Sequence, residues 1–430
     1  MTDSVATGQG RRVRSIIGGS AGNLVEWYDW YAYAAFTLYF APQIFPAEDP
    51  TTELLTAALV FAGGFLIRPI GAWAMGIYSD RHGRKAGLAL SVTLMCAGSL
   101  IIAACPTYAA IGWGAPLIVT CARLLQGLSV GGEYGAGATY LSEIAGKKHR
   151  GFFASFQYVT LISGQLVAIL LLLVLQQVMS EAALEAWGWR IPFLIGGVLA
   201  VSVYWLRRGL METESFTRLQ AGERKKSGLI PLLREHPRET VTVMLLTAGG
   251  TLSFYAFSIY MQKFLVDTSD FDRATSSRIN AGSLLVFMAL QPLVGALSDR
   301  IGRKPLLIAF GVAGTLLTYP IFTALEATRD AWTAFAIVTG SLVIVSGYSA
   351  ISGVLKAELF PAHIRTLGVA LPYAIANAIF GGTAETVALG LKKAGWGSGF
   401  YWYVTAMIAL TLVTAVLMRD TRTNSRILED

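Results

Sequence analysis

The sequence predicts an all-α membrane protein with twelve transmembrane helices in two pseudo-symmetric six-helix bundles. Composition is the first reason: 54% of the 430 residues are hydrophobic and 14% are charged, whereas soluble proteins carry about 25% charged residues. The second reason is that apolar segments of roughly 20 residues, the length of a helix that crosses the hydrocarbon core, fill most of the chain. The third is a ten-residue motif that occurs once in each half.

Hydropathy places the helices in order along the chain. Before the longest polar stretch, the candidate spans are 16–40, 54–78, 86–106, 113–140, 151–178 and 188–207. After that stretch, they are 240–265, 278–298, 304–325, 331–355, 364–391 and 398–418. Because the number of spans is even, both termini are expected on the same side of the membrane.

The polar stretch divides the chain into two parts. We predict an N-terminal six-helix bundle over 1–206, a cytoplasmic linker over 207–239, and a C-terminal six-helix bundle with a cytoplasmic tail over 240–430. The linker is rich in Arg, Glu and Lys and contains Pro231 and Pro237, a composition that suits a surface segment.

Basic residues predict the orientation. Clusters of Lys and Arg lie at 81–85, 147–150, 224–226 and 300–304, all in segments on the side of the termini. Cytoplasmic loops carry such an excess of basic residues, so we expect both termini in the cytoplasm. The net charge of +7 then reflects topology, and we expect no nucleic-acid partner.

A repeated motif ends the second and the eighth span. Residues 76–85 and 295–304 both read G-x-x-x-D-R-x-G-R-K, 219 positions apart. The first Gly permits close helix approach, the second allows a tight turn, and the Asp can cap a helix N-terminus of the other half or pair with an Arg of the loop. The alternative is a basic turn that only sets topology. We predict a gating latch made by Gly76, Asp80, Arg81, Gly83, Arg84, Gly295, Asp299, Arg300, Gly302 and Arg303.

This motif resembles the signature of the major facilitator superfamily, and the likeness extends over essentially the whole chain. Residues 123–133 are similar to the family's R-x-x-Q-G-x-x-x-G-G-E segment. The branch resembled is that of the metabolite:proton symporters, on the evidence of segments 22–29, 64–71 and 187–193. Within that branch, segments 151–162 and 376–382 resemble carriers of α-ketoglutarate.

The resemblance implies a function. A secondary active transporter of this kind works by alternating access, here as proton-coupled symport of α-ketoglutarate or a similar dicarboxylate, with H⁺ as the coupling ion. The alternative is a proton symporter or exchanger for another organic acid or zwitterion, such as citrate, shikimate or proline. We expect a monomer in the cytoplasmic (inner) membrane of a bacterium.

Three arginines lie where charge is costly, and ionisable groups inside a bilayer are usually functional. Arg68 and Arg123 fall near the middle of the second and fourth spans. A guanidinium binds carboxylates in a planar, bidentate manner, so we predict substrate contact for both. The alternatives are a permanent ion pair of Arg68 with Glu26 or Asp29 and a structural role for Arg123. Arg190, at the outer start of the sixth span, is predicted either at the rim of the cavity or as a surface anchor.

Three carboxyl groups are candidates for proton coupling. Glu26 and Asp29 lie one helical turn apart in the first span, and Glu133 lies in the inner third of the fourth. Burial disfavours the charged form, which suits a group that takes up and releases a proton. Each could instead be a permanent partner of a nearby arginine.

Neutral polar side chains also occur inside spans. Any one of them is more often an interhelical hydrogen-bond partner than a ligand contact. Those we predict as substrate-binding donors or acceptors are Gln157, Gln165, Tyr255 and Asn377.

A basic and an acidic residue border the inner end of the tenth span. Lys356 and Glu358 are expected to reach the membrane surface through their long side chains. With Arg365 they are predicted to form a structural latch of the second half.

An enzyme is not expected. The sequence contains no P-loop, no nucleophile elbow, no H-E-x-x-H and no Cys/His cluster with metal-ligand spacing. We therefore predict no catalytic residue, no metal and no cofactor.

Overall fold

A computed structural model describes residues 2–82, 84–130, 134, 138–139, 141–142, 149–208, 228–361 and 364–427. Within these ranges the description excludes the side chains of 2–22, 76–77, 79–82, 84–89, 203–208 and 422–423. Two predicted site residues, Gly83 and Glu133, lie outside the described residues. The side chains of Asp80, Arg81 and Arg84 also lie outside them, as does most of the predicted linker.

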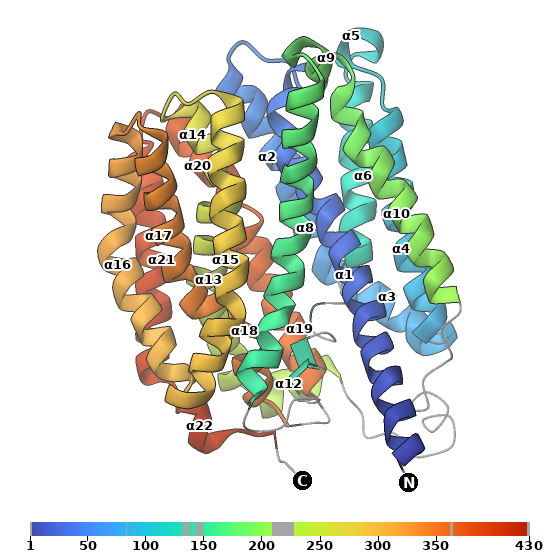
Figure 1. The fold of residues 1–430 in the computed structure, drawn as a ribbon, viewed down its shortest axis with the longest axis vertical. Helices are drawn as coiled ribbons and strands as arrows, with labels where there is room; N and C mark the ends of the chain where they lie inside the picture. Colours follow the sequence, from blue (N-terminus) through green and yellow to red (C-terminus); the bar gives the residue numbers. More distant parts are fainter. Residues whose placement is uncertain are drawn as a thin grey trace.

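Helices of the N-terminal half run nearly parallel to one another and form one bundle (Figure 1). Three short helices connect its long ones: α5 (Tyr108–Ile111), α9 (Glu181–Ala186) and η2 (Gly188–Arg190). The long helices are α1 (Thr2–Ile44), α2 (Pro50–Leu66), α3 (Arg68–His82), α4 (Arg84–Ala104), α6 (Gly114–Val130), α8 (Arg150–Val178) and α10 (Ile191–Arg208).

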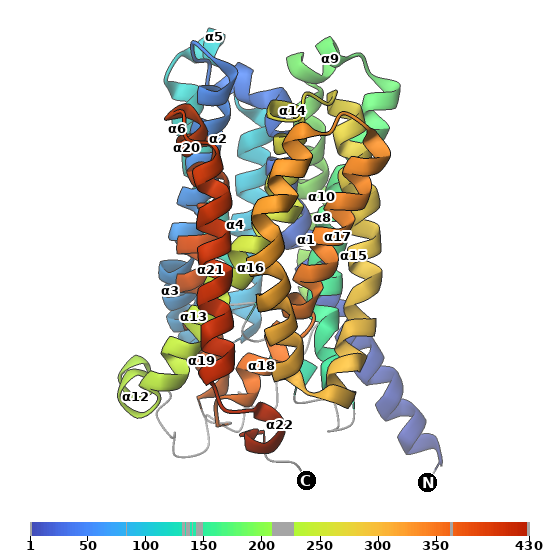
Figure 2. The same cartoon turned by 90° about the vertical axis from the view of Figure 1, so that its left-hand side faces the viewer.

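Helices of the C-terminal half form a second bundle beside the first (Figure 1). Short helices α12 (Leu229–Glu235) and α22 (Thr421–Asn424) lie at the end of the molecule that carries both termini, here called the terminal end (Figure 2). The other elements are α13 (Pro237–Phe254), η3 (Tyr255–Ile259), α14 (Tyr260–Asp267), α15 (Arg273–Ile301), α16 (Arg303–Ala327), α17 (Ala331–Ser349), α18 (Ser352–Glu358), α19 (Arg365–Ala376), η4 (Asn377–Gly381), α20 (Ala384–Lys393) and α21 (Ser398–Leu417).

These helices match the twelve predicted spans in order. Eight uninterrupted or nearly uninterrupted helices of the described chain are long and apolar enough to cross a membrane, and three shorter apolar helices cover 90–104, 114–130 and 188–202. The remaining span is α1, which runs alongside them and whose Trp, Tyr and Asp residues lower its hydropathy. The fold is therefore the predicted all-α membrane fold of two six-helix bundles.

Four of the long helices are interrupted, which hydropathy did not predict. The second span breaks at Ile67, directly before Arg68, and the tenth breaks at Ala350 and Ile351. The seventh and eleventh spans each contain a π-helical segment, η3 and η4. Such π segments occur frequently at functional sites because they re-aim side chains within a helix.

Glycines bring particular helices into close contact. A Cβ at Gly127 of α6 would collide with the backbone oxygen of Gly64 of α2, and one at Gly71 of α3 would collide with the backbone of Leu128. Between the bundles, a Cβ at Gly295 of α15 would lie 2.6 Å from the carbonyl oxygen of Gly151 of α8. Small residues at helix crossings of this kind are typical of membrane proteins.

Candidate functional site

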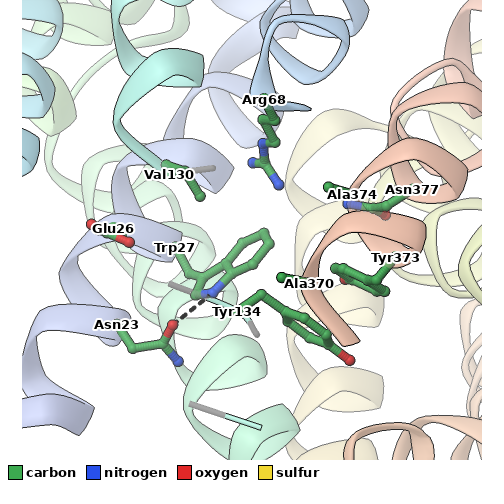
Figure 3. Close-up of a pocket in the computed structure, with 10 residues that line it drawn as sticks. All are labelled: Asn23, Glu26, Trp27, Arg68, Val130, Tyr134, Ala370, Tyr373, Ala374 and Asn377. Atoms are coloured by element: carbon green, nitrogen blue, oxygen red, sulfur yellow. Dashed lines mark hydrogen bonds between the residues drawn. The ribbon is translucent and has the colours of Figure 1, made fainter. Parts of the chain in front are cut away.

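A cavity lies between the two bundles, about halfway along α1 (Figure 3). The space between its lining atoms is about 420 Å³, a figure that includes the open solvent in front of it. Both bundles contribute to its wall, as expected for a site that two rocking halves share. The lining residues are Asn23, Glu26, Trp27, Arg68, Val130, Tyr134, Ala370, Tyr373, Ala374 and Asn377.

Arg68 is the cation of this cavity. It follows the break at Ile67, so it begins α3 and points into the space between α1 and α19 (Figure 3). Its side chain is 4% exposed, and its guanidinium carbon lies 3.8 Å from the ring centre of Phe65 and 4.1 Å from that of Trp30. These cation–π contacts hold the faces of the guanidinium and leave its edge for a ligand.

That edge has no partner in the described chain. The Nε and Nη2 atoms of Arg68 are buried, and neither donates a hydrogen bond to an acceptor in the described chain. Nε–H and Nη2–H are the two donors that bind a carboxylate side-on. Arg68 thus has no hydrogen bond to Glu26 or Asp29 in this arrangement of the helices. The predicted alternative, a permanent ion pair with one of these carboxylates, stays a prediction.

Aromatic and amide side chains complete the wall. The indole Nε1 of Trp27 donates to Asn23 Oδ1 at 3.0 Å, and Asn23 Nδ2 donates to Thr160 Oγ1 of α8 at 2.8 Å. From opposite bundles, Tyr134 and Tyr373 stack with their ring centres 3.6 Å apart and their planes 10° apart. The stacked pair joins the two bundles on the side of the cavity nearer the terminal end.

A second buried arginine lies behind the wall rather than in it. Arg123 of α6 is fully buried and packs on Trp30, 3.9 Å from the ring centre, which is the ring that also contacts Arg68. Its Nη1 donates to Gln126 Oε1 at 2.7 Å, and Gln126 Nε2 donates to Asp29 Oδ2. Ser99 Oγ donates to the other oxygen of Asp29. Arg123 is therefore joined through Nη1 to a buried network that spans α1, α4 and α6, while its Nε and Nη2 have no hydrogen-bond partner in the described chain.

The two carboxyl groups of α1 thus have different surroundings. Glu26 lines the cavity, whereas Asp29, one turn further on, is fully buried in the network with Ser99 and Gln126. Their roles in proton coupling stay predictions. Of these two carboxyl groups, Glu26 is the one that lines the cavity, through which a proton could arrive.

The other predicted substrate residues divide between the cavity and its surroundings. Asn377, the first residue of η4, lines the cavity. Tyr255 of η3 packs edge-on against Phe65, with ring centres 5.4 Å apart. Gln165 Nε2 donates to the carbonyl oxygen of Ser258 at 2.9 Å, which ties α8 to η3. Gln157, also on α8, is buried outside the cavity lining.

Arg190 is not part of the cavity, which corrects one of its two predicted placements. Its Nη2 donates to the carbonyl oxygen of Cys105 at 2.8 Å and its Nη1 to that of Ala186 at 3.3 Å. Its guanidinium also packs on Trp189. These contacts lie in the loops opposite the terminal end, so Arg190 anchors loops of the N-terminal bundle.

Several cavity residues were not predicted from the sequence: Asn23, Trp27, Tyr134 and Tyr373. An aromatic residue within a span is usually a packing residue, so the aromatic cluster of α1 favoured packing over a site. Trp27 lies within a segment that resembles the symporter branch, which was the one available signal. Nothing in the sequence marked Tyr134 or Tyr373 as a site residue, because each is positioned by stacking on the other, which lies in the opposite bundle.

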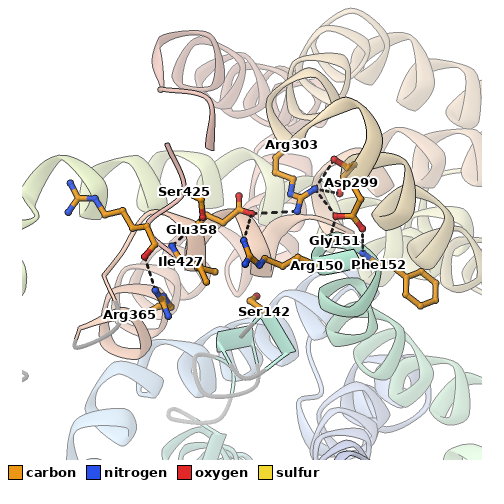
Figure 4. A network of polar contacts seen from close by, with 12 residues as sticks. Ser142, Arg150, Gly151, Phe152, Asp299, Arg303, Glu358, Arg365, Ser425 and Ile427 are labelled. Atoms are coloured by element: carbon orange, nitrogen blue, oxygen red, sulfur yellow. Dashed lines mark hydrogen bonds and ion pairs between the residues drawn. The ribbon is translucent and has the colours of Figure 1, made fainter. Parts of the chain in front are cut away.

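The second copy of the repeated motif lies at the contact between bundles at the terminal end (Figure 4). Asp299 Oδ1 and Oδ2 accept hydrogen bonds from the backbone N–H groups of Gly151 (2.8 Å) and Phe152 (3.0 Å), at the start of α8. Arg303 Nη1 donates to the same carboxylate at 2.9 Å. Gly302 has φ of 96°, a left-handed conformation that favours glycine, and this permits the tight turn into α16.

Two further residues extend this network. Glu358 Oε1 lies 3.8 Å from Arg150 Nη1 and 3.5 Å from Arg303 Nη2, so one carboxylate contacts arginines of both bundles (Figure 4). Arg365 instead donates to carbonyl oxygens of Phe360 and Arg426, while Arg300 is exposed.

Lys356 does not reach the surface, contrary to the prediction. It is fully buried. Its Nζ donates to Ser352 Oγ at 2.8 Å, Tyr348 Oη at 3.3 Å and Tyr134 Oη at 3.5 Å. The break before α18 turns this side chain inward. Hydropathy predicted one continuous helix over residues 331–355 and therefore could not predict this orientation.

Comparisons with known proteins agree with this architecture. A family model described as sugar (and other) transporter matches residues 16–237 and again 213–427. The chain is 51% identical over 408 residues to the α-ketoglutarate permease of Escherichia coli (strain K12), covering 95% of this chain and 94% of that protein. It is 32% identical to a citrate-proton symporter of Salmonella typhi, covering 96% and 95%.

A solved structure has the same fold. The crystal structure of a D-xylose-proton symporter superposes with a TM-score of 0.74 at 17% identity, covering 95% of this chain and 98% of that one. The family model, the repeated motif and the two bundles around a shared cavity lead to one conclusion. The chain is a multi-pass membrane transporter that belongs to the sugar (and other) transporter family of the major facilitator superfamily.

Proposed function

We propose that this chain carries α-ketoglutarate, or a similar small dicarboxylate, across the membrane together with protons, by alternating access. The observation that carries the proposal is the unpaired, buried, side-on edge of Arg68 in a cavity shared by both bundles. The relative that is 51% identical over nearly the whole chain is an α-ketoglutarate permease, which supports the same cargo.

Binding of a carboxylate would give Arg68 a hydrogen-bonded anion, which it does not have in the described chain. Arg68 has cation–π contacts but no hydrogen-bonded carboxylate partner there, and a buried charge without one is costly. A carboxylate of the substrate can accept from Nε and Nη2 together. Asn377, across the cavity, offers an amide that can contact the substrate's remaining oxygens.

Proton coupling follows from the charge of the cargo. Moving a dianion inward against a negative interior costs about 2.3 kcal/mol per charge per 100 mV. Accompanying protons reduce this cost, and Glu26 in the cavity wall is a group that can carry one. In the proposed cycle, the substrate binds Arg68 while Glu26 is protonated, the bundles rock, and loss of the proton on the other side favours release.

The remaining features of the proposal concern placement. In this proposal the terminal end faces the cytoplasm, because the basic clusters of the sequence predict that side and the described cluster at 300–304 lies at that end (Figure 4), and the membrane is the bacterial inner membrane. The chain works as a monomer, with bundles 1–206 and 240–430 that move about the linker 207–239. We propose transport with H⁺ as the coupling ion, without a cofactor or a chemical reaction.

Uptake of labelled α-ketoglutarate into proteoliposomes tests the proposal. An imposed pH gradient, acidic outside, should accelerate uptake. The Arg68→Ala variant should reduce uptake about 30-fold or more, because truncating one partner of a buried charge pair costs about 2 kcal/mol or more. Arg190→Ala is the matched control, because that arginine contacts backbone carbonyls, and it should retain uptake within about threefold. Uptake that ignores the pH gradient would refute coupling, and equal effects of the two variants would refute the role of Arg68.

A second cargo class is favoured by other relatives. A citrate-proton symporter is 32% identical to this chain and a shikimate transporter of Escherichia coli is 30% identical. Competition by citrate, shikimate and proline against labelled α-ketoglutarate separates the candidates. Proline as the strongest competitor, with Arg68→Ala unaffected, would indicate a zwitterion carrier instead.

A further inference from the structure

Lys356 is a buried lysine that has no role in the proposed transport cycle. It lies on α18 in the C-terminal bundle and is fully buried. All three polar atoms that its Nζ contacts are hydroxyl oxygens: those of Ser352, Tyr348 and Tyr134. None of them carries a charge, so its contacts in the described chain leave the ammonium uncompensated.

Another buried lysine of the same bundle shows the usual solution. Lys263 of α14 is 2% exposed and donates to both oxygens of Glu385, at 2.6 and 2.7 Å. A buried cation is stable when a carboxylate pairs with it and costly when none does. Lys356 lacks such a carboxylate in the described chain, so its environment suits a lysine that pairs with a carboxylate of a bound ligand.

Its position relative to the cavity suggests which ligand. The ammonium lies 4.2 Å from the ring centre of Tyr373 and 5.4 Å from that of Tyr134. Those two rings form the stacked pair that closes one side of the cavity (Figure 3). Lys356 thus lies directly behind a wall made of one residue from each bundle, and parting of the bundles would separate the rings.

The cavity itself supplies too little positive charge for a dicarboxylate. Of the residues that line it in the described chain, Arg68 is the only cation, and Glu26 is acidic. A ligand with two carboxylates needs a second positively charged group to avoid burying an unpaired anion.

We propose that Lys356 binds the second carboxylate of the dicarboxylate and becomes accessible to it when Tyr134 and Tyr373 separate. Arg68 and Lys356 then hold the two ends of one ligand, and each belongs to a different bundle. The ligand would thereby link the movement of the bundles to its own length and charge. This inference rests on the proposed function, because it presumes a cargo with two carboxylates.

The test compares two ligands on the purified, full-length protein in nanodiscs. α-Ketoglutarate has both carboxylates, and 2-oxopentanoate has the same carbon chain without the distal one. Titration calorimetry, with competition where binding is weak, gives the ratio of their dissociation constants. In the unmodified protein we expect a preference of at least 30-fold for the dicarboxylate. Lys356→Met should reduce this ratio at least tenfold, and Lys356→Arg should retain most of it.

Controls separate this role from a structural one. Lys392→Met, which removes a lysine paired with Asp267 away from the cavity, should leave the ratio unchanged. A thermal unfolding curve verifies that Lys356→Met is folded, and Lys356→Arg provides a second variant that keeps the charge. An unchanged ratio in Lys356→Met, with both ligands weakened alike, would overturn the inference. Absence of α-ketoglutarate binding to the unmodified protein would instead overturn the proposed function, and the inference with it.

Discussion

At the scale of single residues, the site depends on two arginines that share one aromatic ring. Arg68 and Arg123 lie 4.1 and 3.9 Å from the ring centre of Trp30. Arg68 faces the cavity, whereas Arg123 is tied through Gln126 to the buried Asp29. The two guanidiniums therefore have separate tasks: one is open to a ligand, and the other is held inside the N-terminal bundle.

Glu26→Gln tests which carboxyl group carries the proton. The substitution keeps the shape of a side chain that lines the cavity but removes its titration. We expect accumulation of α-ketoglutarate driven by a pH gradient to be lost, while exchange of labelled for unlabelled substrate at equal pH continues within about threefold of the unmodified rate. Counterflow and gradient-driven uptake in the same proteoliposomes measure both. Retained accumulation would exclude Glu26 as the carrier.

Asp29→Asn should behave differently because this carboxylate belongs to a buried network. It accepts hydrogen bonds from Ser99 and Gln126, and it is the acidic group of the network that includes Arg123. Breaking a buried charged network costs about 3–5 kcal/mol. We expect a lower thermal unfolding temperature, with exchange and gradient-driven uptake reduced to the same extent. If exchange alone persisted, Asp29 would be the proton carrier.

At the scale of helices, the interruptions and the termini position the functional groups. The break at Ile67 allows Arg68 to begin α3 inside the cavity, and the π-helical η4 begins with Asn377. The N-terminus of α8 is capped from the opposite bundle, by Asp299. A cap that crosses between bundles can stabilise a helix only while the bundles touch at that end.

Asp299→Ala should therefore shift the conformational equilibrium. Losing an N-cap costs about 0.5–2 kcal/mol, and here the loss falls only on states closed at the terminal end. We expect states open at that end to become several-fold more populated. A cysteine at Ala374, in a variant without Cys96, Cys105 and Cys121, should react correspondingly faster with an impermeant maleimide applied from that side.

A matched control uses a cap within one bundle. Asp330 caps α17 by accepting from the N–H of Thr333 at 2.8 Å. Asp330→Ala removes a cap of the same kind without touching the other bundle, so the cysteine should react at its original rate. Equal acceleration by both substitutions would show that general destabilisation, rather than release of the contact between bundles, is the cause.

At the scale of the whole molecule, the bundles touch on both sides of the cavity. At the terminal end they meet through Asp299, Arg303 and Glu358. At the opposite end, Arg273 of α15 pairs with Glu185 and, at 3.1 Å, with Glu181 of α9. Alternating access requires that each set of contacts open while the other stays closed.

A thiol cross-link across the opposite end should stop transport. Cysteines in place of Glu185 and Arg273, in the background without native cysteines, would join the bundles at a contact that must open. We expect a bifunctional thiol reagent with a cleavable disulfide to reduce uptake more than tenfold, and cleavage by a reductant to restore it. Cysteines in place of Asp267 and Lys392, which pair inside the C-terminal bundle at 2.8 Å, should leave uptake unchanged after the same treatment. Full uptake with the first pair linked would refute movement at this end.

The sequence by itself determined the number and order of the spans, the repeat and the presence of charged residues within the membrane. These properties are local. Twenty apolar residues predict a helix wherever that helix packs, and the repeated Asp-Arg motif can be recognised without knowing what it contacts in the fold. The sequence also singled out Arg68, Glu26 and Asn377 as candidates, because a polar residue inside a span is unusual in any fold. All three line the cavity, and their roles stay predictions.

Only the tertiary structure decided how those residues are used. Arg68 and Arg123 look equivalent along the chain, but only Arg68 lines the cavity, whereas Arg123 is buried behind it and bonded through Nη1 to Gln126. Lys356 was expected at the surface, and the break before α18 buries it behind a stacked pair of tyrosines from both bundles. Partners of this kind come from helices far apart in sequence, and their meeting depends on helix rotation, breaks and tilt, which hydropathy does not encode.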